Sequence, residues 1–140
     1  MTPAHARISS YKDLIVWKKS MELVREVYAA TAKFPREETF GLTSQVRRSA
    51  VSVPSNIAEG QGRATKGEFI QFLAHARGSL FELETQVFIG SELGYLSGED
   101  ADCLGEKVQE VARILNGLLT SLGVSSRKPS TIHYPLSTRR

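Results

Sequence analysis

The sequence predicts an all-α protein, an antiparallel up-down-up-down four-helix bundle, and three observations support this fold. Four segments carry apolar residues three and four positions apart, which is the spacing of one face of an α-helix. No segment shows the apolar–polar alternation that is typical of a half-buried strand. The connections between the four segments are short, and short connections make consecutive helices antiparallel neighbours. The length of 140 residues is usual for one domain with a single core.

The first helix is expected from about Tyr11 to Lys33. Ser10 is the predicted N-cap, with Asp13 three residues later in the place of the usual glutamate. Pro35 is expected to end this helix, because it pushes Phe34 out of the α region. The predicted core stripe consists of Leu14, Trp17, Met21, Val24 and Tyr28.

The second helix is expected from about Thr39 to Gly60, and it is rich in small residues. Its predicted core stripe consists of Leu42, Val46, Ala50 (or Ser49), Val53 and Ile57. Around that stripe lie Ser44, Ser49, Ser52, Ser55 and Ala58. Small side chains allow a neighbouring helix to approach closely. Pro54 removes one backbone donor in the middle of the helix and predicts a kink there.

The third helix is expected to end near Leu93. Gly60 and Gly62 end the helix before it, and Thr65 with Glu68 forms a capping box at its start. Gly94 follows its last turn, as a C′ glycine does. The predicted core face consists of Phe69, Phe72, Ala76, Leu80, Leu83 and Val87.

The fourth helix is expected from the N-cap Ser97 to about Leu122. Glu99 and Asp100 lie in its first turn, where negative charge is favoured by the helix dipole. Its apolar residues follow a regular four-three spacing, namely Leu104, Val108, Val111, Leu115, Leu118 and Leu122.

The third helix carries more apolar residues than one core stripe needs. Ile70, Phe81, Phe88 and Ile89 lie off its predicted core face. A second apolar face of this kind indicates self-association, because monomers rarely expose large apolar patches. The alternative is a wider core face within one bundle.

The charge of the chain is divided between its body and its ends. The net charge is +3, but all 15 acidic residues lie between Asp13 and Glu110, and residues 11–122 have 13 basic residues against them. The other positive charges are Arg7, Arg127, Lys128, Arg139 and Arg140. We therefore expect a flexible N-terminal tail over residues 1–9, a bundle over 10–122 and a basic, disordered C-terminal tail over 123–140. A bundle with a net charge of −2 does not resemble a uniformly basic nucleic-acid-binding domain.

The sequence also predicts a cytoplasmic protein without a membrane anchor. The single cysteine, Cys103, excludes an intrachain disulfide and is compatible with a reducing compartment. No apolar run approaches the roughly 20 residues that span a bilayer. The N-terminus has no apolar stretch of the kind found in secretory signals.

Motifs over about residues 10 to 122 are specific enough to indicate a family. They are Tyr11-x-Asp13-Leu14, Val16-Trp17, Phe34-Pro35, Glu38-x-Phe40-Gly41-Leu42, Gln45-x-Arg47-Arg48-x-Ala50, Ser52-x-Pro54-x-Asn56-Ile57-Ala58-Glu59-Gly60 and Gly78-Ser79-x-x-Glu82-Leu83-Glu84. Together they resemble the 23S rRNA intervening-sequence proteins, a four-helix-bundle family also labelled S23 ribosomal proteins.

This resemblance implies a homopentameric ring of bundles, in a family with no established enzymatic activity. A related branch, the accessory variability protein of diversity-generating retroelements, is basic, binds nucleic acid and has a reverse transcriptase as its partner. The helical body of this chain departs from that branch, because it is not net positive.

No arrangement of residues predicts a catalytic, metal or cofactor site. His5, His75 and His133 have no partner at metal-ligand spacing, and Cys103 has no nearby histidine or second cysteine. Gly60-Gln61-Gly62 with Lys66 follows a helix and lacks the Gly-Lys-Ser/Thr ending of a phosphate loop. Glu82 and Glu84 diverge on a helix and cannot share a site.

Asn56 and Glu59, which lie between Pro54 and Gly60, allow two interpretations. In the structural one, Asn56 bonds the carbonyl freed by Pro54, and Glu59 pairs with an arginine. The candidate arginines are Arg47, Arg48 and Arg77. In the functional one, the amide and the carboxylate bind a ligand.

The candidate contacts to nucleic acid are basic side chains. Arg47 and Arg48 diverge by about 100° on their helix, so one is expected to take a buried or intersubunit partner while the other faces solvent. With Arg63 and Lys66 they form either a phosphate-binding patch or a solvated charged face. In the tail, Arg127, Lys128, Arg139 and Arg140 would be gathered by a ring, and His133 and Tyr134 would add stacking on bases.

The sequence thus predicts a non-enzymatic, oligomeric interaction protein that binds RNA or DNA. The alternative is an adaptor for a partner protein that binds no nucleic acid.

Overall fold

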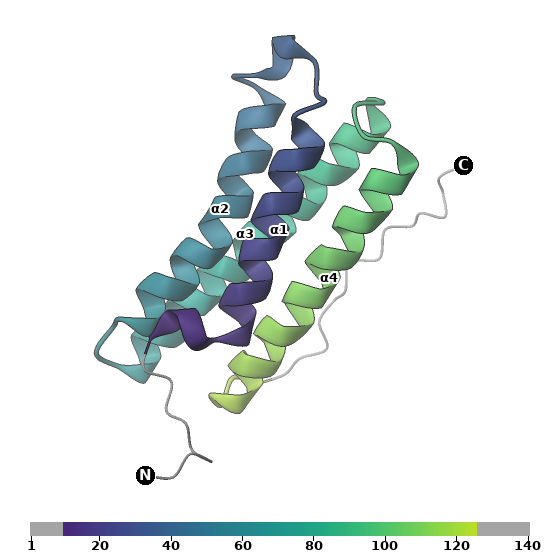
Figure 1. The fold of residues 1–140 in the computed structure, drawn as a ribbon. Helices are drawn as coiled ribbons and strands as arrows, with labels where there is room; N and C mark the ends of the chain where they lie inside the picture. The colour runs from purple at the N-terminus through teal and green to yellow at the C-terminus, as the bar shows by residue number, and fades with distance from the viewer. Residues whose placement is uncertain (1–9, 126–140) are drawn as a thin grey trace.

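The computed structural model describes residues 10–125, which form a bundle of four α-helices (Figure 1). In chain order the elements are η2 (Tyr11–Asp13), α1 (Ile15–Thr31), η3 (Arg36–Glu38), α2 (Leu42–Gln61), α3 (Lys66–Glu92) and α4 (Gly98–Ser121). The described part of the chain contains no strand. The prediction of an all-α four-helix bundle is confirmed.

Side-chain bonds between neighbouring helices show that consecutive helices are antiparallel. Arg47 near the start of α2 bonds Thr31 at the end of α1, Ser52 of α2 bonds Ser79 of α3, and Arg77 of α3 bonds Asn116 of α4. Lys33, just after α1, pairs with Asp100 in the first turn of α4, which closes the bundle. One end of the bundle therefore holds the α1–α2 and α3–α4 connections. The other holds the α2–α3 connection and both ends of the described chain (Figure 1).

The core lies along the bundle axis, and all four helices contribute to it. Its fully enclosed members include Leu23 of α1, Ile57 of α2, Leu80 of α3 and Leu115 of α4. The predicted stripes of α2 and α4 hold for most of their positions. In α3 the prediction omitted Leu73, which is completely buried.

The predicted core stripe of the first helix is wrong, and so is its start. The buried residues of α1 are Val16, Ser20, Leu23, Val27, Ala30 and Thr31, whereas Tyr28 is exposed and Leu14, Trp17, Met21 and Val24 are only partly buried. Leu14 and Val24 are partly buried and pack against the outside of the core. Ser10 caps the short helix η2 by accepting from the Lys12 N–H, and α1 itself begins four residues after the predicted start.

Helices α2 and α3 form the most extensive contact in the bundle. The hydroxyls of Ser52 and Ser79 lie 2.7 Å apart across this contact. Gly62 is the C-cap of α2, as predicted, whereas Gly60 lies within the last turn of the helix, which continues to Gln61. A Cβ on Gly60 would lie 2.7 Å from the Cβ of Phe72, so this glycine permits close packing.

The ends of α3 and α4 are capped as predicted. Thr65 Oγ1 accepts from the Glu68 N–H, and Ser97 Oγ accepts from the Asp100 N–H. Gly94 after α3 has a φ of 80°, which a residue with a side chain rarely adopts. After α4, the Val124 N–H donates to the Leu119 carbonyl, and Val124 packs partly buried against the core.

Candidate functional site

Arg47 and Arg48 are adjacent on α2 but have different surroundings. Arg47 Nε donates to Thr31 Oγ1 at 2.8 Å, and its guanidinium lies 4.3 Å from the centre of the Tyr28 ring. Arg48 is exposed and has no bond to another described side chain. Arg47 is therefore the arginine that takes a partner within the bundle, and Arg48 is the one that faces solvent.

Arg63 and Lys66 lie at the other end of α2, so the four basic residues do not form one patch. About 13 residues of continuous helix separate Arg48 from the last residue of α2, which is about 20 Å at 1.5 Å per residue. Arg63 donates to Glu59 at 2.8 Å and stacks over the Phe72 ring, with 4.7 Å from its Cζ atom to the ring centre. Lys66 is exposed. The predicted residues Arg127, Lys128, Arg139 and Arg140, with His133 and Tyr134, lie outside the described residues.

Asn56 and Glu59 bond to nearby residues of their own helix or loop. Asn56 Nδ2 donates to the Ser52 carbonyl at 2.8 Å and to Ser52 Oγ at 3.0 Å. The carbonyl freed by Pro54 is that of Ala50, four residues before the proline, so the expected partner of Asn56 is wrong. Glu59 pairs with Arg63 and not with Arg47, Arg48 or Arg77. Arg77 instead donates to Asn116 of α4.

The outer face of α3 exposes large apolar side chains. Phe81, Phe88 and Ile89 are 44%, 38% and 40% exposed, and Leu93 after the helix is exposed as well. Ile70 differs from these three, because it is partly buried against the core. Gly78 also lies on this face, and a Cβ added to it would meet no neighbouring atom within 4 Å. This surface, formed by Phe81, Phe88 and Ile89, is called the α3 apolar face below.

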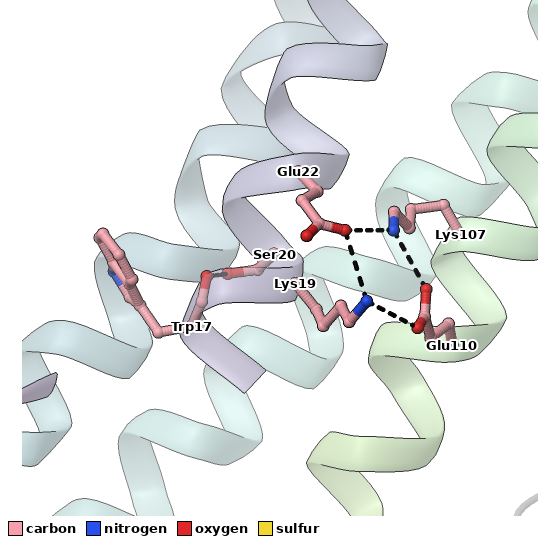
Figure 2. A network of polar contacts seen from close by, with 6 residues as sticks. All are labelled: Trp17, Lys19, Ser20, Glu22, Lys107 and Glu110. Atoms are coloured by element: carbon pink, nitrogen blue, oxygen red, sulfur yellow. Dashed lines mark hydrogen bonds and ion pairs between the residues drawn. The ribbon is translucent and has the colours of Figure 1, made fainter. Parts of the chain in front are cut away.

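A charged network joins α1 to α4, and sequence reasoning did not find it (Figure 2). Lys107 bonds both Glu22 and Glu110, and Lys19 pairs with Glu110 at 3.3 Å and with Glu22 at 3.6 Å. The hydrogen bonds of Lys107 lower the pKa of Glu22 and of Glu110. The bond to Glu22 in turn raises the pKa of Lys107. Helical spacing places Lys19 and Glu22 on one face, but only the packed bundle shows which charges of α4 oppose them.

The charges of the bundle are divided between its two halves. The half next to the α1–α2 and α3–α4 connections, residues 23–51 and 80–109, has ten acidic and six basic residues. The other half, residues 10–22, 52–79 and 110–125, has five acidic and seven basic residues. We call them the acidic half and the basic half. The antiparallel topology produces this separation, because it brings together segments that are distant in the sequence.

The described residues contain no cluster of metal-ligating side chains. Cys103 is exposed on α4, and desolvation together with the nearby carboxylates raises the pKa of its thiol, which disfavours the nucleophilic thiolate. The ring of His75 packs edge-on against that of Phe72, with 5.9 Å between the ring centres.

In the part of the chain that is described, no helix has the length and apolar character needed to cross a membrane.

Comparison with known proteins agrees with the arrangement of the helices. The family model of the 23S rRNA-intervening sequence proteins matches residues 12–117. The fold is similar to that in the crystal structure of a protein with unknown function from the S23 ribosomal protein family, from Bacteroides thetaiotaomicron. The two sequences are 24% identical, and the structures match with a TM-score of 0.68. The match covers 75% of this chain and 98% of that protein. No curated protein matches this chain.

Proposed function

The chain belongs to the family of 23S rRNA-intervening sequence proteins, and we propose that it is a non-enzymatic, oligomeric protein that binds RNA or DNA at the basic half of its bundle. The division of charge between the two halves supports this proposal best. A phosphate backbone is attracted to one half of such a molecule and repelled by the other.

The basic half also carries both ends of the described chain. Lys12, Arg63 and Lys66 lie near this end of the bundle, and all of them are exposed. The chain leaves the bundle here at Ser125, and Arg127 and Lys128 follow within three residues. The basic residues outside the bundle are thus attached next to those on its surface.

Self-association would multiply these contacts. The α3 apolar face offers a surface for contact between copies, and we propose that it assembles the chain into the homopentameric ring implied by the family resemblance. Five copies would carry five basic halves, and several weak contacts made at once give a useful affinity without a deep binding site.

Fluorescence anisotropy with labelled single-stranded RNA and a DNA duplex, at about 50 mM salt and above, tests the nucleic-acid part. We expect binding that weakens as salt rises. Replacing both Arg63 and Lys66 by alanine should reduce the slope of log K against log salt by about two, one for each lost phosphate contact. Arg48→Ala is the matched control, since it removes an exposed arginine from the acidic half. The absence of binding, or an equal loss in the control, would overturn the nucleic-acid proposal.

The net negative charge of the bundle favours a second candidate, an adaptor for a partner protein such as a reverse transcriptase. A partner that remains bound after nuclease treatment, together with no anisotropy change on either nucleic acid, would support the adaptor.

A further inference from the structure

A groove between α1 and α4 lies in the acidic half, and it is not part of the proposed nucleic-acid site. Its volume is about 250 Å³, and it is lined by Glu26, Ala29, Ala30, Lys33, Asp100, Cys103 and Leu104. Ala30 and Leu104 are buried members of the core and form an apolar floor, and the exposed residues Ala29 and Cys103 also line the groove.

The rim of this groove is acidic. Glu26 and Asp100 line it directly, and Glu99 and Glu106 lie close enough to act electrostatically on Cys103. Lys33 is the one basic residue in the lining, and it pairs with Asp100 at 3.0 Å. Because Lys33 is paired with Asp100, the lining offers no basic partner to the other three carboxylates of the rim, those of Glu26, Glu99 and Glu106. An occupant that fits must therefore combine apolar side chains with positive charge.

The segment 126–140 of the same chain has this composition. It contains four basic residues, Arg127, Lys128, Arg139 and Arg140, and no acidic residue. Between the two basic pairs, Ile132, Tyr134 and Leu136 occupy every second position, so an extended chain presents them on one side.

The length of the segment agrees with the position of the groove. Cys103 lies 19 residues before Leu122 on α4, which is about 29 Å along the helix. An extended chain covers about 3.3 Å per residue, so one that leaves the bundle at Ser125 and returns along α4 reaches the level of Cys103 after about nine residues. That residue is Tyr134. The apolar positions 132–136 would then lie at the groove. Glu99 and Asp100 lie only about 6 Å beyond Cys103 along α4, so the chain must turn back after Leu136 for Arg139 and Arg140 to reach them.

We propose that the segment 126–140 binds in the groove between α1 and α4 of its own chain, with its apolar residues on the floor and its last two arginines at the acidic rim. This interaction does not depend on nucleic-acid binding.

Cys103 is the sole cysteine of the chain and lies in the groove, so its alkylation by iodoacetamide reports on occupancy. The rate is measured over a range of pH, since this separates access to the thiolate from a change in the pKa of the thiol. We expect the thiolate in the full chain to react about threefold or more slowly than in a chain that ends at Ser125, because a tethered segment acts at a high effective concentration.

Variants of the full chain separate the proposed contacts from general charge effects. Arg139→Ser with Arg140→Ser should raise the rate to that of the shortened chain, as should Glu26→Gln with Asp100→Asn. Arg127→Ser with Lys128→Ser is the matched control: it removes the same charge close to Ser125, far from the groove, and should leave Cys103 protected. Equal rates in the full and shortened chains would overturn the proposal. Protection that increases with protein concentration would overturn it as well, because the segment would then come from a second copy.

Discussion

At Gly60, a single hydrogen in place of a side chain determines how closely two helices approach. Phe72 of α3 occupies the space where a Cβ would lie, and Phe69 Cδ1 is only 3.1 Å from that position. Both neighbours belong to α3, and the Phe72 contact is to its Cβ, which cannot move without the backbone. The sequence predicts a helix stop at this glycine, because glycine is common at helix ends, but its role is in packing.

We predict opposite effects for alanine at two helical glycines. Gly60→Ala should destabilise the bundle, because overpacking of about 1–3 kcal/mol outweighs the gain in helix propensity of at most about 1 kcal/mol. Gly117→Ala in α4 meets no atom within 4 Å and should stabilise the protein by roughly 0.5–1 kcal/mol. Urea unfolding at one protein concentration measures both. An unchanged or increased stability of Gly60→Ala would show that α3 moves away without cost.

Among the elements, α1 shows how a stripe can be assigned to the wrong side of a helix. Its predicted stripe includes the larger side chains Trp17, Met21 and Tyr28, whereas its buried face includes the small polar residues Ser20 and Thr31. Ser20 Oγ donates to the Trp17 carbonyl at 2.8 Å (Figure 2). Thr31 Oγ1 donates to the Val27 carbonyl at 2.7 Å, so both hydroxyls are satisfied within the helix. Hydropathy alone cannot distinguish such residues from exposed ones.

The charged network between α1 and α4 predicts a loss of stability in acid. The pKa values of Glu22 and Glu110 are lowered in the folded protein, mainly by hydrogen bonds from Lys107. The pKa of Glu38 is lowered as well, by bonds from the Leu42 N–H and the Tyr95 hydroxyl. A lowered pKa gives stability that is present above the unfolded value of 4.5 and is lost as the pH falls through the folded value.

Urea unfolding at pH 7 and at pH 3.5 measures this loss. Glu22→Gln should reduce the difference between the two pH values, because it removes one of the carboxylates that must be protonated. Glu82→Gln, at an exposed position of α3, is the control and should leave the difference unchanged. If both variants have the same pH dependence as the original chain, the network does not contribute to acid unfolding.

For the whole molecule, the α3 apolar face predicts assembly into a ring. A ring of five would have a mass about five times the 15.4 kDa of one chain, which light scattering measures directly. Phe81→Glu should weaken association roughly tenfold or more, because it places a charge in an apolar contact, and 1.4 kcal/mol is already a factor of ten. Ile15→Glu, at an exposed apolar residue of α1, is the matched control and should not change the mass. A mass of one chain for the original protein would rule out the ring.

The sequence by itself determined the family, the number and order of the four helices, and most of their approximate ends. These features depend on local chemistry: periodic apolar residues, side-chain caps at Thr65 and Ser97, a positive φ at Gly94 and a long contiguous motif. The tertiary structure decided which face of α1 is buried, why Gly60 has no side chain and how the charges divide between the two halves. Each of these depends on residues that are far apart in the sequence, and only packing brings them into contact.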